Sequence, residues 1–175
     1  MQASAFWKAV TMDQANLLPA LVSLLEELGV RYCVIGGQAV NAYVEPLVSL
    51  DLDLVVAAKE RESVEAALRE RFKVEQFAHS VNVSMPGSDL RVQIQTDPRY
   101  QPFVERASRR EVLGVRLPVA SVEDVLQGKI WAALDPEGRS SKRRKDLLDI
   151  QRLLEWRPEL RTLVPEEVLG RLGAL

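Results

Sequence analysis

The chain has 175 residues, 47% of them hydrophobic and 27% charged, with a formal net charge of −2. This length and composition predict a compact globular protein with a sizeable apolar core. The nearly balanced charge argues against a protein that coats nucleic acid by charge alone, although a local basic patch stays open. The single cysteine, Cys33, excludes an intrachain disulfide and a thiolate metal cluster. Without a secretory signal pattern or an apolar run of the roughly 20 residues that span a membrane, we expect a soluble cytoplasmic protein with no membrane partner.

The first part of the chain alternates between helical and strand patterns. Leucines at helical spacing, followed by Gly29 as a stop, indicate an opening helix. The predicted elements are, in chain order, a helix over 15–29, a strand over 31–35, a brief helix over 38–44, a strand over 50–57 and a charged helix over 59–72.

Strand patterns then continue up to residue 120, where the character of the sequence changes. We predict strands over 73–77, 79–85, 89–96 and 112–120. Ser121 opens a Ser-x-x-Asp capping pattern, and helices are predicted over 121–134 and 142–156, followed by short helical turns. The layout is an α/β part over 1–120 and a helical part over 121–175, which together form one compact domain.

Asp51 and Asp53 interrupt what otherwise reads as a buried strand. Strand alternation places these two carboxylates on one face and Leu52 and Leu54 on the other. Two carboxylates on one face repel each other unless a cation lies beside them. Mg²⁺ or Mn²⁺ fits, because hard divalent ions are held by one or two carboxylates together with substrate phosphates. The pair therefore predicts a metal site.

Two glycines, Gly36 and Gly37, lie between a predicted strand and the next helix. Glycines let a phosphate approach the backbone, and the amides at the start of the helix face it. A glycine pair alone is usually a turn, and a D-x-D pair alone is common by chance. In this order, however, they indicate metal-assisted phosphoryl or nucleotidyl chemistry.

The pattern "GG-x-A … P-x-x-S-x-D-x-D" resembles the signature of the DNA polymerase β-like nucleotidyltransferases. The chain is most similar to the minimal bacterial branch, which is related to AbiEii-type abortive-infection toxins and to the antitoxin partners of HEPN-domain ribonucleases. Two later segments, "LQGKIWAAL" and "RRKDLLDI", extend the resemblance over roughly residues 18–155.

The resemblance implies an α+β nucleotidyltransferase fold, with a mixed sheet flanked by helices and a C-terminal helical segment. It implies Mg²⁺ or Mn²⁺ on Asp51 and Asp53, with an NTP as the substrate. By the same resemblance, Lys129 joins the two aspartates as a catalytic residue. The residues that would bind the nucleotide are Gly36, Gly37, Gln38, Lys145 and Asp146.

The chain departs from this pattern at the position of the third carboxylate. In the family that residue lies on a later strand, completes the metal site and can act as the base. Here the strand "DLRVQIQTD" places Gln93 there, and an amide can neither serve as base nor supply charge. Asp89 and Asp97, at the two ends of that strand, and Glu75 are the candidate replacements. Leu47 and Ser49 also stand where the branch often has arginine and threonine.

Two functions follow, and the glycines, the D-x-D pair and "KDLLDI" favour the first. It is a metal-dependent transferase that moves NMP from an NTP to a hydroxyl of a protein, a tRNA or a small molecule, in a toxin–antitoxin or phage-defence system. The second, favoured by Gln93, is a degenerate member that binds a nucleotide or neutralises a toxin. The basic run around Lys142 and Lys145 either steers a triphosphate or RNA, or pairs with Asp146 and Asp149 on one helix face.

Overall fold

A seven-stranded mixed sheet organises the chain, in the strand order β3-β4-β5-β2-β1-β7-β6. The computed structural model describes residues 3–13 and 15–174. Strand β2 lies near the centre, antiparallel to β1 and parallel to β5. The strands are β1 (Tyr32–Ile35), β2 (Asp51–Val56), β3 (Lys73–Gln76), β4 (Ser80–Ser84), β5 (Arg91–Gln95), β6 (Ser108–Val112) and β7 (Val115–Val119).

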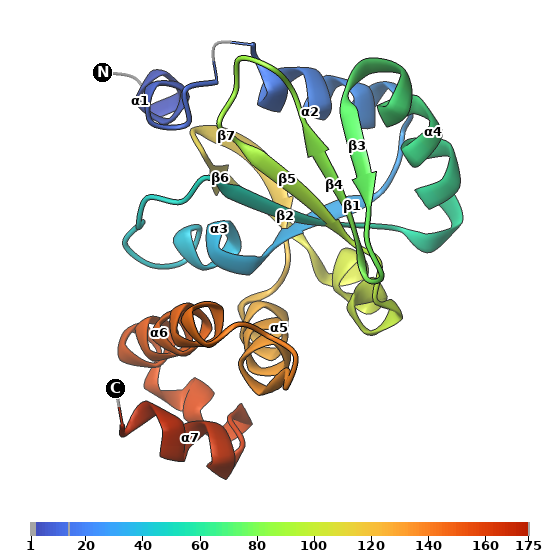
Figure 1. Cartoon of the computed structure of the whole chain (residues 1–175). Coiled ribbons are helices and arrows are strands. Elements are labelled where there is room, and N and C mark those ends of the chain that lie inside the picture. Colours follow the sequence, from blue (N-terminus) through green and yellow to red (C-terminus); the bar gives the residue numbers. More distant parts are fainter. Residues whose placement is uncertain (1–2, 14, 175) are drawn as a thin grey trace.

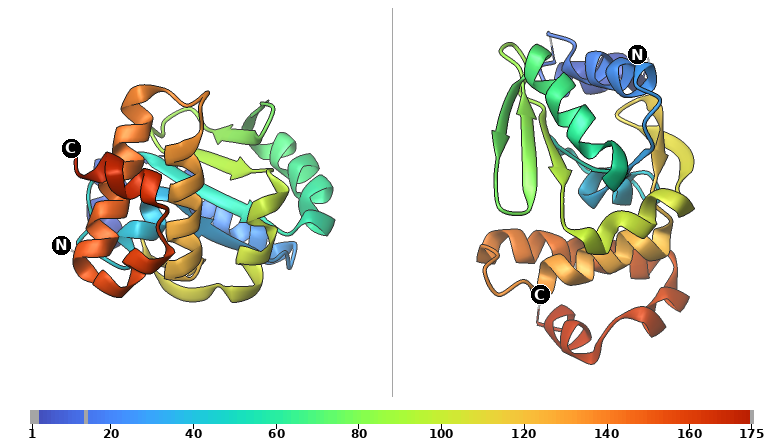
Figure 2. Two further views of the ribbon diagram at one scale, coloured as in Figure 1. Left: turned by 90° about the horizontal axis from the view of Figure 1, so that it is seen from below. Right: turned by 90° about the vertical axis from the view of Figure 1, so that its right-hand side faces the viewer.

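Helices cover the sheet from two sides. Figures 1 and 2 show α2 and α4 on one side, with α3, α5 and α6 on the other and α7 beyond them. The helices are α1 (Ala3–Val10), α2 (Leu17–Glu27), α3 (Gly36–Asn41), α4 (Arg61–Arg71), α5 (Val122–Leu134), α6 (Ser140–Trp156) and α7 (Glu166–Leu172). Short 3-10 segments are η1 (Ala58–Glu60), η2 (Pro98–Arg106) and η3 (Pro158–Leu163). No helix in the described ranges is long and apolar enough to cross a membrane.

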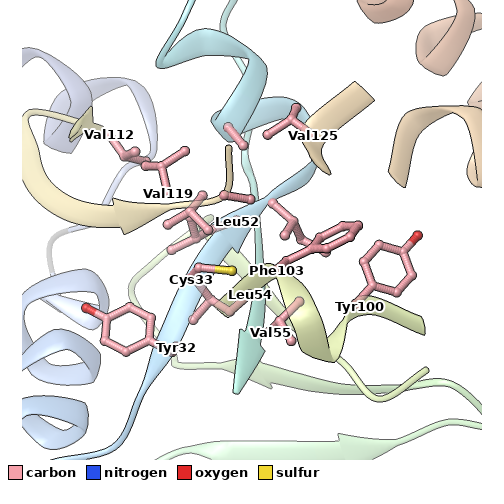
Figure 3. Close-up of a cluster of buried hydrophobic side chains, with 14 of the residues drawn as sticks. Tyr32, Cys33, Leu52, Leu54, Val55, Tyr100, Phe103, Val112, Val119 and Val125 are labelled. Carbon is pink, nitrogen blue, oxygen red and sulfur yellow. The ribbon is translucent and has the colours of Figure 1, made fainter. Parts of the chain in front are cut away.

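The apolar core follows the alternation of the strands. Leu52 and Leu54 of β2 are buried with Cys33 of β1, as Figure 3 shows. Asp51 and Asp53, which alternate with the two leucines, face the other way. The same buried cluster includes Ile150 and Leu153 of α6. Because the C-terminal helices share this core, we propose that the parts before and after residue 120 fold as one domain.

The predicted fold class is confirmed, and most predicted elements lie where expected. Ser121 caps α5, accepting a hydrogen bond from the backbone N–H of Asp124 at 3.2 Å. The strand predicted over 112–120 is confirmed as β7, but its first residues are wrong: Val112 ends β6, and the chain reverses at Leu113 and Gly114. Leu113 and Gly114 both have positive φ, 52° and 78°, as a two-residue hairpin turn requires. Strand β6 and helix α1 were not predicted.

Candidate active site

Gly36 lies at the junction where β1 ends and α3 begins, and its conformation depends on the absence of a side chain. Its φ is +70°, and a Cβ there would overlap the Oδ2 atom of Asp53. At Gly37 an added Cβ would meet only Asp149 Oδ2, at 3.8 Å, so this backbone is open toward the cavity. The junction thus brings a stretch of backbone without side chains against Asp53 of β2.

Asp51 and Asp53 lie on one face of β2 and line the same cavity. Asp51 Oδ1 lies 2.8 Å from Arg91 Nε of the neighbouring strand β5. Burial raises the pKa of Asp53 to about 6; the Asp51 carboxylate adds to this rise, and Lys129 opposes it. Asp53 is therefore ionised near pH 7.5, and its charge is only partly compensated.

The strand register places a row of polar residues across the sheet from Asp53. Asp53 is opposite Gln93 of β5, Gln93 is opposite Asn82 of β4, and Asn82 is opposite Glu75 of β3. All four line the cavity. Asn82 Oδ1 is buried and has no hydrogen-bond partner among the described residues. The next two residues across the sheet from Asp53, Gln93 and Asn82, are therefore neutral amides and not carboxylates.

None of the candidate replacements brings a third carboxylate to Asp53. Glu75 is two strands from Gln93, roughly 10 Å at the usual spacing between strands. Asp97 forms a forked ion pair with Arg99, which lowers the pKa of Asp97, and neither it nor Asp89 lines the cavity. Within the described residues, no three His, Cys, Asp or Glu side chains gather as a metal site.

Lys129 of α5 is buried in an ion-pair network with α6. Its Nζ lies 2.9 Å from Asp146 Oδ1 and 2.8 Å from Asp149 Oδ2. Burial of the amine acts to lower the pKa of Lys129, but these two carboxylates outweigh it and hold the pKa above its ordinary value. Lys142 and Lys145 are exposed, and among the described residues the two aspartates form their ion pairs with Lys129 and Arg152. The alternative in which these lysines pair with the aspartates on one helix face therefore does not hold. The ion pairs of Lys129 cross between helices.

Arg152 continues this network to the loop that leads into β2. Its guanidinium binds Asp149 Oδ1 at 2.8 Å and Asn41 Oδ1 at 3.1 Å, and it donates to the backbone carbonyl of Glu45. Asn41 in turn bonds the backbone of Leu47 in both directions. Neither Arg152 nor Asn41 was predicted as a site residue, because the contact that joins them links positions 111 residues apart.

The cavity formed by these residues measures about 680 Å³, within the range of small-molecule sites. It brings together Gly37, both strand aspartates, Gln93, Lys129, Lys145 and Asp146 from the predicted set. Gly36 borders it through Asp53. Gln38 does not line it: this side chain is 2% exposed and donates to the carbonyl of Ser49 at 3.0 Å. Gln38 thus holds the loop before Asp51.

Known structures share this fold at low sequence identity. The antibiotic-resistance factor ANT(2″)-Ia, solved in solution, aligns with a TM-score of 0.59 and 15% identity over 92% of this chain and 90% of that one. The lincosamide adenylyltransferase LnuA aligns at 0.53 and 14%, over 78% and 95%. An antigenic nucleotidyltransferase-like protein from Paracoccidioides brasiliensis aligns at 0.53 and 20%, over 95% and 86%. At these identities the likeness shows the nucleotidyltransferase fold alone.

No curated protein sequence matches the chain. A family model, described as the nucleotidyl transferase AbiEii toxin of type IV toxin–antitoxin systems, matches residues 51–172. The match begins at Asp51, so it includes the paired aspartates, Gln93 and the ion-pair network, while the glycine junction lies before it. Because the match covers more than half of the chain, the protein belongs to the AbiEii nucleotidyl transferase family.

Proposed function

We propose that this protein binds an NTP with a divalent metal on Asp51 and Asp53 and transfers its NMP group to a hydroxyl. The hydroxyl oxygen, which loses its proton, bonds to the α-phosphorus, and the bond to pyrophosphate, the leaving group, breaks. The observation that carries the proposal is the placement of two same-face carboxylates beside a bare glycine backbone in one cavity. The acceptor classes that fit a hydroxyl are a protein, a tRNA and a small molecule. Membership of a toxin–antitoxin family also supports a protein partner, a cognate antitoxin.

The side chains present fit one Mg²⁺ or Mn²⁺ ion. Asp51 and Asp53 offer carboxylate oxygens, the ligands that such ions prefer, and burial raises the pKa of Asp53. A divalent cation bound to both would offset the repulsion between the two carboxylates. When bound, such an ion neutralises phosphate charge and polarises the phosphorus–oxygen bond under attack. A second ion would find only the Gln93 amide beside Asp53, which favours weak or absent activation of the acceptor.

The cations around the cavity divide into two groups with different tasks. Arg139, just before α6, and Lys142 and Lys145 of α6 line it. The two lysines are exposed, so they are available to a triphosphate. Lys129 is already paired with Asp146 and Asp149. We assign Lys129 to positioning: it holds α5 against α6 and keeps the pKa of Asp53 lower than burial alone would set it.

Isothermal titration calorimetry with NTP and Mg²⁺ tests this proposal. Wild type should bind, and the Asp51→Asn/Asp53→Asn variant should lose binding that depends on the metal. Asp97→Asn, outside the cavity, is the matched control and should bind like wild type. If the double variant binds as tightly as wild type, the metal site is elsewhere and the proposal is wrong.

A second function, nucleotide binding without transfer, is favoured by Gln93 and Asn82. Gln93 lies opposite Asp53 and Asn82 lies opposite Gln93, so neither of the next two positions across the sheet offers a carboxylate that could act as base. Incubating labelled NTP with protein, tRNA and small-hydroxyl acceptors separates the two functions. Label in an acceptor supports the transferase, and tight NTP binding with no labelled product supports the degenerate member.

A further inference from the structure

Three exposed aliphatic side chains border the cavity, and we call them the aliphatic rim: Leu47, Val48 and Leu148. Their exposed fractions are 48%, 66% and 45%. Two precede β2 in the loop over 42–50, and the third lies on α6. Apolar side chains grouped at the border of a polar cavity indicate a surface that binds something.

The exposure of Leu47 does not come from a loose loop. The Asn41 amide donates to the carbonyl of Leu47 at 2.7 Å and accepts from its N–H at 3.0 Å. Gln38 holds the carbonyl of Ser49, and Arg152 holds that of Glu45. The backbone is fixed on both sides of Leu47 and Val48, so these side chains are presented to solvent in a set position.

The two parts of the rim lie at the same end of the cavity. Leu148 is one helical turn before Arg152, on the same side of α6. The Arg152 guanidinium bonds Asn41 and the Glu45 carbonyl, so it joins α6 to the loop that carries Leu47. A flat group entering at this end would contact aliphatic carbon from the loop and from the helix.

We propose that the aliphatic rim binds the base of the nucleotide, which rests on the function proposed above. The polar row of Gln93, Asn82 and Glu75 extends from Asp53 toward β3, on the opposite side of β2 from β1 and α3. A hydroxyl-bearing acceptor suits that side, where the buried Asn82 Oδ1 lacks a partner among the described residues.

The apolar faces of a base suit the rim instead. No aromatic side chain lines the cavity in the described part of the chain, so aliphatic carbon is what a base would pack against. The cavity volume of about 680 Å³ accommodates a nucleotide, with its phosphates at Gly37 and the two aspartates of β2.

The test compares a nucleotide with its phosphate part alone. The variant is Leu47→Ser/Leu148→Ser, and because both residues are exposed it should fold normally. The control is Leu163→Ser on η3, a leucine that is 52% exposed and away from the cavity. The probes, both with Mg²⁺, are inorganic tripolyphosphate and whichever of ATP, GTP, CTP and UTP binds wild type most tightly.

Replacing the two rim leucines should weaken NTP binding about tenfold, since roughly 50 Å² of apolar contact is lost. Tripolyphosphate should bind the variant and wild type within about twofold, and Leu163→Ser should change neither. Unchanged NTP affinity in the variant would overturn the proposal and would indicate that the rim binds the acceptor or a partner instead. Equal weakening of both probes would also overturn it, because the rim would then act on the phosphate site.

Wild type itself separates this inference from the proposed function. If it binds tripolyphosphate and every NTP equally well, the phosphate site stands and the base site falls. If it binds neither probe, the proposed function fails and the base site fails with it.

Discussion

Asp53 and Gln93 lie directly opposite each other on the parallel strands β2 and β5, and both side chains line the cavity. In the proposed site, a neutral amide thus stands at the position that we assign to the third carboxylate of a two-metal site. Two metal ions about 3.5–4 Å apart need enough negative charge from the protein to be held together. We propose that this pair of residues decides between the two functions considered above, a full transferase and a nucleotide-binding protein.

We therefore expect Gln93→Asp to bind Mn²⁺ more tightly than wild type and to raise any transfer of labelled NTP. The new carboxylate would lie next to Asp53 and supply the missing charge, while the metal would offset their repulsion. Without metal, the variant should be less stable by about 1 kcal/mol. Manganese titration followed by electron paramagnetic resonance measures the binding.

Gln95→Asp is the matched control for this change. It lies on the same strand and the same face, two residues further along, opposite Val55 rather than Asp53. Tighter Mn²⁺ binding by both variants would mean that added charge alone is responsible. Robust transfer by wild type that Gln93→Asp leaves unchanged or lowers would show that another residue completes the site.

Replacing Asp53 by Asn should stabilise the protein in the absence of metal at neutral pH. The pKa of Asp53 in the folded state is about 6, above its ordinary value of 3.8, so the folded protein holds this proton more tightly than the unfolded chain. The ionised group therefore costs stability, and this cost grows from about pH 4 to pH 6 and is full above it. It amounts to at most about 3 kcal/mol.

Urea unfolding of wild type and Asp53→Asn, both with EDTA, measures this difference. At pH 7.5 the variant should be the more stable protein, and at pH 4 the two should be nearly equal. Adding Mg²⁺ at pH 7.5 should stabilise wild type and leave the variant unchanged. A variant that is less stable than wild type at pH 7.5 would contradict the expectation.

Local patterns in the sequence predicted the strand that carries the site, and the reason is physical. Alternation along β2 separates Leu52 and Leu54 from the two aspartates whatever lies around the strand. The same rule placed Gln93 on the cavity side of β5, between the buried Val92 and Ile94. Features decided by a period of two residues can be read from one short segment.

Features that depend on distant partners could not be predicted in this way. Lys129 and Asp146 are 17 residues apart, and Arg152 and Asn41 are 111 apart, so no local spacing reveals either contact. The hairpin at Leu113 and Gly114 was missed for another reason. A leucine with positive φ is rare, and the apolar residues on both sides continue the strand pattern across the turn.

Lys129→Met should lower the free energy of unfolding by about 3 kcal/mol or more relative to wild type. The change leaves Asp146 and Asp149 without the cation between them, and unpaired buried charge is costly. Urea unfolding at pH 7.5 measures the loss. If the variant is destabilised in this way, we would attribute a fall in its activity first to the loss of the contact between α5 and α6, and not to a lost contact with substrate.

Arg31→Met is the control for the loss of an ion pair. Its bond to Glu105 is short, 2.8 Å, but both side chains are exposed, 50% and 64%. Water can replace a partner there, so we expect a cost of at most about 1 kcal/mol. Equal losses in the two variants would show that burial of the Lys129 network adds nothing to its stability.

Gly36→Ala should disable the site, while Gly29→Ala should leave it intact. Both glycines have positive φ, +70° and +60°, so alanine brings backbone strain of about 1–2 kcal/mol at either position. At Gly29 a Cβ meets nothing within 4 Å, whereas at Gly36 it would overlap Asp53 Oδ2. The carboxylate must then move out of the cavity.

Calorimetry should show loss of Mg²⁺-dependent NTP binding in Gly36→Ala alone, and urea unfolding should show the larger destabilisation in that variant. If both variants keep wild-type binding, the close approach of Gly36 and Asp53 has no part in holding the metal.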